Sequence, residues 1–110
     1  MLFAAAVHDF EHTGTTNNFH VQTRSRLAMI YNDRSVLENH HISYAWKLFR
    51  NNNLNFLENI DLEIVTSIRK LTISLVLATD LTFHREIIQV LVEKNIKKKK
   101  KIKIEKPKKI

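Results

Sequence analysis

The residues that could do chemistry begin with the run His8-Asp9-Phe10-Glu11-His12, which has the pattern HDxxH. On a helix, residues four apart lie on one face, so His8 and His12 would point the same way and Asp9 would stand at the edge of that face. Imidazole and carboxylate together suit Zn²⁺, Mn²⁺ or Fe, and a carboxylate can bridge to a harder ion such as Mg²⁺. The spacing allows two interpretations, a metal site or imidazoles that cap the carbonyls at a helix end.

A second polar group, Glu38, His40 and His41, lies inside the apolar segment 36–50. His41 falls on the apolar stripe of that segment, and Glu38 precedes it by three residues. Polar groups that face a core usually meet a partner there, and a role beside a bound ion is one explanation. From the pattern alone we favour the simpler interpretation, exposed polar residues on the outer face of a helix.

A third polar pair, Thr79 and Asp80, lies between two apolar segments. Thr and Asp are favoured at helix N-caps, where their oxygens accept from the first free amides. The pattern therefore predicts that the pair caps the helix that follows it.

The composition limits what kind of protein can position these residues. The chain has 110 residues, no Cys, one Gly and one Pro, which excludes disulfides and Cys-ligated zinc and disfavours a sheet with its many turns. The formal charge of +7 is uneven, because residues 94–110 hold ten Lys against one Glu. No apolar run approaches the roughly 20 residues of a membrane span. We expect an all-α protein in the cytoplasm.

The apolar periodicity predicts a series of helices followed by a basic tail. Residues 32–35 are expected to form a turn and N-cap, and residues 13–24 a polar, turn-like segment. The tail should be an open, solvated chain because its like charges repel, and it could touch acidic partners non-specifically. We predict two parts, residues 1–93 and 94–110, with helices at about Leu2–His12, Ser25–Tyr31, Val36–Arg50, Asp61–Ala78 and Leu81–Glu93.

Three segments in this order resemble the catalytic domain of class I 3′,5′-cyclic-nucleotide phosphodiesterases. They are HDFEHTGTTNNFH (8–20), YNDRSVLENHH (31–41) and LVLATDLTFH (75–84). The amino-acid sequences of the first two segments are most similar to those of the calmodulin-dependent subfamily. The resemblance covers about residues 2–93. It implies an all-α partial helical bundle that is a fragment of that catalytic domain.

The resemblance also implies an activity and a site. The activity is hydrolysis of cAMP or cGMP to the 5′-monophosphate with two divalent ions, Zn²⁺ and Mg²⁺ or Mn²⁺. The roles carried over by motif are metal ligation by His8 and Asp9, holding of waters of the second ion by His12, Glu38 and Thr79, and support of the adjacent loop by Asn17.

The family's upstream HNxxH motif, which supplies the general-acid His, has no counterpart in this sequence, so we assign no catalytic acid in the chain. A later metal-binding Asp and a purine-reading Gln also lack counterparts. We therefore expect a fragment whose partner is a cyclic nucleotide. The alternative is a catalytically inactive remnant that binds other proteins through exposed helices. We predict no specific nucleic-acid partner, and calmodulin regulation is not part of the prediction.

Overall fold

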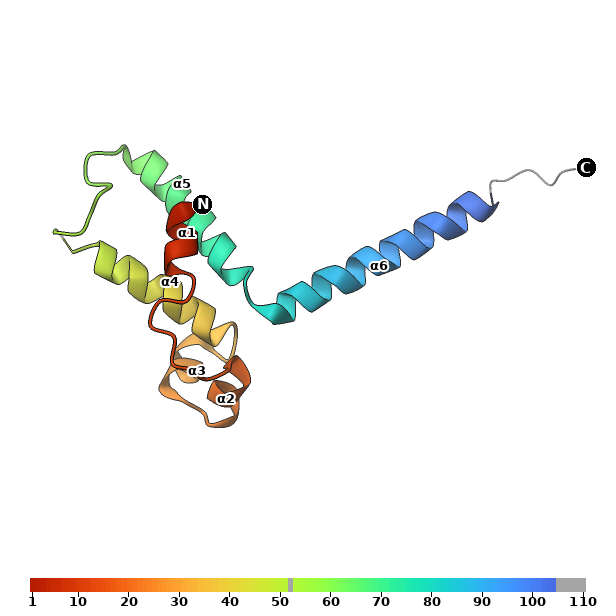
Figure 1. Ribbon diagram of the computed structural model, residues 1–110, viewed down its shortest axis with the longest axis horizontal. Helices are drawn as coiled ribbons and strands as arrows, with labels where there is room; N and C mark the ends of the chain where they lie inside the picture. Colours follow the sequence, from red (N-terminus) through yellow and green to blue (C-terminus); the bar gives the residue numbers. More distant parts are fainter. Residues whose placement is uncertain (52, 105–110) are drawn as a thin grey trace, which may run out of the picture. The chain divides into compact units, whose positions relative to one another are not determined.

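Helices and their connections make up the whole described part of the computed structural model, residues 1–51 and 53–104, in which no strand occurs. This confirms the all-α prediction. The elements in order are α1 (Leu2–Val7), α2 (Asn17–Gln22), α3 (Arg26–Tyr31), α4 (Val36–Phe49), α5 (Leu62–Leu77) and α6 (Leu81–Ile104) (Figure 1). The contacts divide the chain into two units, with the boundary between Asp80 and Leu81.

The core of the first unit lies where α1, α4 and α5 meet. Ala4 of α1, Ile42 of α4 and Val76 of α5 form one buried cluster, and the small side chain of Ala4 lets the helices approach closely. A second cluster is built on Trp46 and Phe49 of α4. Helices α2 and α3 contact each other and α4. The long helix α4 thus carries side chains of both clusters.

The N-terminal end of α4 is capped by a residue from another element. Asn17, the first residue of α2, accepts a hydrogen bond from the backbone N–H of Leu37 through Oδ1 (2.8 Å). Its Nδ2 donates to Oε2 of Glu38 at 2.8 Å. Ser35 holds the N-cap position as expected, but its hydroxyl donates to Oδ2 of the buried Asp80 at 2.7 Å. Three hydrogen bonds made by side chains therefore fix the start of α4.

Two predicted boundaries were wrong. The segment 13–24 is not all turn, because α2 forms within it and the hydroxyl of Thr16 accepts from the N–H of Phe19, as an N-cap does. The predicted helix from Leu2 to His12 ends at Val7. By contrast, the short helix beginning after Ser25 was predicted correctly, and the Ser25 hydroxyl accepts from the N–H of Ala28.

The second unit begins with α6, which continues as one helix through the lysine-rich segment to Ile104 (Figure 1). The prediction of an open chain was therefore wrong for residues 94–104, and residues 105–110 lie outside the described part. Lysine is a good helix former, and Glu93 precedes Lys97 by four residues, a favourable helical pair. Within the described residues, no helix combines the length and the apolar character needed to cross a bilayer.

Candidate metal centre

The HDxxH residues lie on a tight turn that follows α1, so the prediction that His8 and His12 share a helical face was wrong. The N–H groups of Phe10 and His12 bond to carbonyls three residues back, those of Val7 and Asp9, at 3.0 and 3.1 Å. Glu11 has a φ of +53°, which a right-handed helix cannot contain. The turn therefore presents its side chains differently from a helix.

Two adjacent imidazoles of α4 hold this turn. Nδ1 of His41 donates to the carbonyl oxygen of Phe10 at 2.6 Å, because a carbonyl can only accept. Nε2 of His40 lies 3.2 Å from Oε2 of Glu11. His40 and His41 are 6% and 2% exposed, so the interpretation of them as outer-face residues was wrong. Both face inward because they anchor the turn to α4.

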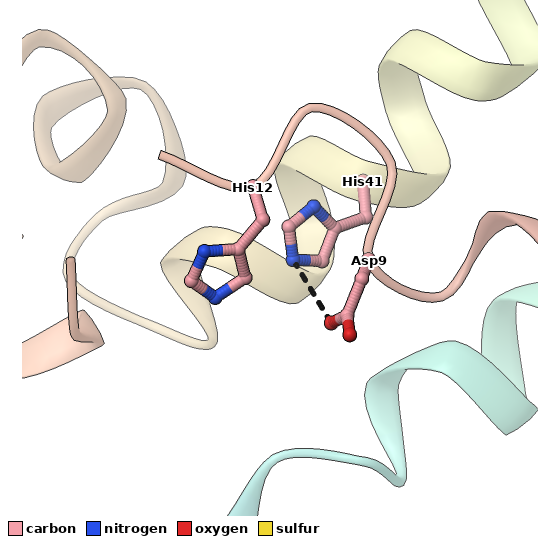
Figure 2. Close-up of side chains that lie close together, drawn as sticks. All are labelled: Asp9, His12 and His41. Carbon is pink, nitrogen blue, oxygen red and sulfur yellow. Dashed lines mark ion pairs between the residues drawn. The ribbon is translucent and has the colours of Figure 1, made fainter. Parts of the chain in front are cut away.

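The Asp9 carboxylate faces an imidazole nitrogen with each of its oxygens. Oδ2 lies 3.2 Å from Nε2 of His8. Oδ1 lies 3.9 Å from Nε2 of His41 (Figure 2). Nδ1 of His8 donates to the carbonyl of Ala5 at 2.6 Å, just as Nδ1 of His41 donates to Phe10. In each neutral ring the proton is therefore on Nδ1, and Nε2 turns a lone pair toward the carboxylate. A cation would satisfy both partners of each contact.

Burial lowers the pKa of the His41 imidazole below its ordinary 6.5, although the Phe10 carbonyl and the Asp9 carboxylate oppose this. Desolvation has this effect because it disfavours the charged imidazolium. His41 is thus held in the neutral form that binds metals. Its Nδ1 bond to a backbone carbonyl is the arrangement that orients metal-ligating histidines in proteins.

Asp9, His12 and His41 form a group whose candidate ligand atoms all lie within 4.8 Å of one another. In tetrahedral zinc coordination, with bonds to N or O of about 2.0–2.2 Å, two ligand atoms lie about 3.3–3.6 Å apart. The Asp9–His41 distance of 3.9 Å is a few tenths of an ångström longer, and the whole group would have to contract by up to roughly 1.5 Å. The types of donor atom suit a divalent cation beside Asp9 after this contraction.

His12 differs from His8 and His41 in its tautomer. The N–H of Gly14 donates to Nδ1 of His12 at 2.9 Å, so in the neutral ring the proton is on Nε2. The ring stacks on His41, with centroids 5.5 Å apart (Figure 2). By distance alone His12 would be a metal ligand. Its neutral tautomer argues against this, because Nδ1 already accepts from Gly14 and the protonated Nε2 has no lone pair to offer a metal. His12 can donate a proton to a water or an anion beside the cation.

The remaining predicted site residues lie at different places in the first unit. Glu38 is half-buried at the start of α4, bound by Asn17, and contributes an attractive charge to His41. The Thr79 hydroxyl donates to the carbonyl of Val76 at 2.7 Å. Oδ2 of Asp80 accepts from the Ser35 hydroxyl, as described above, and the cap of α6 by Thr79 or Asp80 stays a prediction.

Sequence reasoning did not identify two residues as parts of the site. His41 was considered only as a neighbour of an ion, although its place on the apolar stripe of α4 signalled that it faces inward. Glu11 gave no signal, because a glutamate between two polar neighbours in HDFEH looks like an ordinary exposed residue. Its partner His40 is distant in sequence.

The family model and the relatives that match this chain all represent cyclic nucleotide phosphodiesterases. The family model of 3'5'-cyclic nucleotide phosphodiesterase matches residues 1–110. The dual specificity calcium/calmodulin-dependent 3',5'-cyclic nucleotide phosphodiesterase 1B of Homo sapiens is 48% identical over 91 residues, which are 83% of this chain and 17% of the relative. The corresponding enzyme 1C of Mus musculus is 50% identical over 92 residues, 83% of this chain and 13% of the relative.

A solved structure has the same fold as this chain. The phosphodiesterase domain of the RhoPDE fusion protein from the choanoflagellate Salpingoeca rosetta matches with a TM-score of 0.78 and 40% identity. The match covers 84% of this chain and 29% of that domain. The chain thus spans less than a third of the proteins that it resembles.

Proposed function

Because the chain belongs to the 3′,5′-cyclic nucleotide phosphodiesterase family, we propose that it supplies part of a metal-dependent centre that hydrolyses cAMP or cGMP. In this reaction water attacks the cyclic phosphate, the bond from phosphorus to the 3′ oxygen breaks, and the product is the 5′-monophosphate. The calmodulin dependence named for the relatives is not part of the proposal. A cytoplasmic location stays a prediction.

One observation carries the proposal, the Asp9 carboxylate between two imidazoles that turn lone pairs toward it. Oδ2 of Asp9 faces Nε2 of His8 at 3.2 Å and Oδ1 faces Nε2 of His41 at 3.9 Å. When a ring is neutral with its proton on Nδ1, such a contact brings lone pairs together, and either a proton on Nε2 or a bound cation relieves it. Divalent cations held by carboxylate and imidazole remove the repulsion, which supports a metal centre here.

The carboxylate geometry also supports the expected use of two ions. Because each oxygen of Asp9 faces a different imidazole, the group could hold a cation at either oxygen. We propose Zn²⁺ as one ion and Mg²⁺ or Mn²⁺ as the other, with Asp9, His8 and His41 offering the lone pairs. Bound ions would supply a water of lowered pKa and positive charge near the phosphate oxygens.

The other residues act on protons and positions in this proposal. His12, whose Nε2 carries a proton, donates to a water or to a phosphate oxygen beside the ions. Asn17 fixes Glu38 and the start of α4, the helix that carries His41. The role of Thr79 in holding waters of the second ion stays a prediction. In the structure its hydroxyl donates to the carbonyl of Val76, three residues earlier.

The experiment is a graft into a relative. The matched segment of the Homo sapiens 1B enzyme is replaced by the residues of this chain, and hydrolysis of cAMP and cGMP is measured with Zn²⁺ and Mg²⁺ present. The expected result is metal-dependent turnover that Asp9→Asn lowers by more than roughly a hundredfold. Asp33→Asn is the matched control, because Asp33 is exposed and its φ of +63° is one that Asn tolerates.

Two further variants separate the proposed roles. We expect His12→Gln to lower turnover of the graft by roughly tenfold to a hundredfold, as for loss of a hydrogen-bond donor to a water beside the ions, while metal affinity changes less than turnover. His41→Gln should lower metal affinity and turnover together. A folded graft with no turnover, or equal turnover in the Asp9→Asn and Asp33→Asn grafts, would contradict the proposal.

A second function, binding of another protein through exposed helices, has one supporting observation. Ile64 and Leu71 of α5 are about half exposed and line a shallow groove with Ile68. Apolar side chains grouped in this way often mark an interaction site. Co-purification of this chain with an intact relative, and loss of that association in Ile64→Glu, would favour this function over turnover by the chain itself.

A further inference from the structure

A buried imidazole of α2, that of His20, is surrounded by hydroxyl groups and has no role in the proposed function. The residue is 6% exposed. Its Nδ1 lies 2.7 Å from Oγ of Ser25. Its Nε2 lies 2.9 Å from Oγ1 of Thr15 and 3.1 Å from Oγ1 of Thr13. Because a hydroxyl can donate or accept, both ring nitrogens have a hydrogen-bond partner in either neutral tautomer.

The two nitrogens of this ring connect α2 to different segments. Ser25 is the N-cap of α3, so the contact at Nδ1 joins α2 to the start of α3. Thr13 and Thr15 belong to the loop between the HDxxH turn and α2, so the contacts at Nε2 join α2 to that loop. The ring therefore has one side that holds two helices together and another side that holds the loop.

The loop of residues 13–15 is held by side chains. Among the residues that the structure describes, no hydrogen bond between backbone groups involves residues 13–15. The hydroxyls of Thr13 and Thr15 bond to each other and to His20. Between them, the N–H of Gly14 donates to Nδ1 of His12 at 2.9 Å. A loop without backbone hydrogen bonds loses conformational freedom when it is ordered, so its order depends on such anchors.

We propose that His20 is a positioning residue for His12. The two threonines that Nε2 of His20 anchors flank Gly14, whose N–H holds Nδ1 of His12, so the anchor restrains the bond that orients the His12 ring. That ring stacks on His41 beside the candidate metal centre (Figure 2). The action of His12 on a water or a phosphate rests on the proposed function, whereas its positioning by His20 can be measured without turnover.

The test follows hydrogen exchange of the Gly14 N–H by NMR in the full chain, with metal removed by a chelator. Thr13→Val together with Thr15→Val removes both hydroxyls that meet Nε2 and leaves His20 in place. We expect protection of the Gly14 N–H, relative to an unstructured chain of the same sequence, to fall by roughly tenfold because the loop opens more often. The nuclear Overhauser effect between the rings of His12 and His41 should weaken in the same variant.

Thr16→Val is the matched control, because it removes a hydroxyl from the neighbouring position without touching His20. The Thr16 hydroxyl caps α2 by accepting from the N–H of Phe19, so its loss weakens the same helix. We expect protection of the Gly14 N–H to fall by less than about threefold in this variant. The comparison separates the loss of the anchor from a general weakening of α2.

Two substitutions of His20 separate its two contacts. The amide of Asn reaches about as far as Nδ1 of the imidazole, and the amide of Gln about as far as Nε2, so only Gln can keep the contact with the loop. We expect His20→Gln to retain the protection of the Gly14 N–H within about threefold and His20→Asn to lose roughly tenfold. Circular dichroism of each variant shows whether the helices persist.

Three outcomes would overturn the proposal. The first is a Gly14 N–H that exchanges in the wild-type chain as fast as in an unstructured chain. The second is equal loss of protection in the Thr13→Val, Thr15→Val variant and in Thr16→Val, with helix content retained. The third is equal protection in His20→Gln and His20→Asn, which decides the question if the double threonine variant does not fold. A graft without turnover would contradict the proposed function and leave these exchange results unchanged.

Discussion

Removal of the Glu11 carboxylate should destabilise the first unit of the chain by loosening the HDxxH turn from α4. In Glu11→Ala the buried Nε2–H of His40 loses the acceptor that lies 3.2 Å away. Nδ1 of the same ring has no hydrogen-bond partner among the described residues. An unsatisfied buried donor costs about 1–3 kcal/mol, and the half-exposed carboxylate adds little by charge alone, so we expect a loss of about 1–2 kcal/mol.

Alanine isolates this contact, because Ala and Glu pay a similar backbone cost at a φ of +53°. Glu11→Gln keeps an oxygen acceptor and should cost less than about 1 kcal/mol. Glu58→Ala, at an exposed position, is the matched control and should stay within about 0.5 kcal/mol of wild type. Urea unfolding followed by the fluorescence of Trp46, the only Trp, gives each free energy of unfolding. If Glu11→Ala matched Glu58→Ala, the reasoning would be refuted.

Three further predictions concern the free energy of unfolding of the same unit, measured by Trp46 fluorescence in urea. With metal removed by a chelator, the free energy of unfolding should fall as the pH drops below 6.5. Below that pH the unfolded chain protonates His41, whereas the folded chain, in which the pKa of His41 is lowered, does not. His41→Asn should therefore make the free energy of unfolding depend less on pH. Ser35→Ala should cost about 1.5–3 kcal/mol, since it removes a 2.7 Å hydrogen bond to the buried Asp80 carboxylate; no measurable loss would mean that the bond is replaced. Val76→Ala should cost about 2 kcal/mol through the cavity that it leaves at a fully buried position, and a loss below about 0.5 kcal/mol would mean that the core collapses around it.

The long helices of the first unit could be predicted closely from periodicity. The segments expected at Val36–Arg50 and Asp61–Ala78 became Val36–Phe49 and Leu62–Leu77. Each has an apolar stripe over several turns, bounded by polar residues. The local cap at Ser25 was equally visible, since its partner Ala28 lies three residues away.

The end of α1 could not be predicted from local sequence. The carbonyl of Phe10 leaves the helical pattern to accept from His41, 31 residues later in the chain. Helix propensity describes only the neighbours of a residue and cannot register such a partner. The same contact decides the geometry of the site, because it sets both the direction of Asp9 and the tautomer of His41.

The lysine segment shows an error of a different kind. Repulsion among its charges was expected to open the chain, but repulsion between exposed lysines is screened and small in water. No Gly or Pro interrupts the sequence between Leu81 and Ile104, and the helix propensity of lysine is high. The balance of these effects gives a continuous helix to the end of the described residues.

The site was visible in the sequence as a motif but not as a geometry. His8 and Asp9 were identified from HDxxH, and their ring nitrogen and carboxylate are 3.2 Å apart. In their neutral forms, His8 and His41 have a lone pair on Nε2, whereas His12 has a proton there. This difference could be assigned only from the hydrogen-bond partner of Nδ1 in each ring. Those partners are backbone atoms, whose positions follow from the fold.

The most direct test of the account is the affinity of the purified chain for Mn²⁺ and Zn²⁺, measured by calorimetry at a pH where the imidazoles are neutral. We predict binding that Asp9→Asn weakens by more than roughly a hundredfold, whereas the same carboxylate-to-amide change in Asp33→Asn leaves it intact. Equal affinities of wild type and Asp9→Asn would show that the carboxylate between His8 and His41 holds no cation.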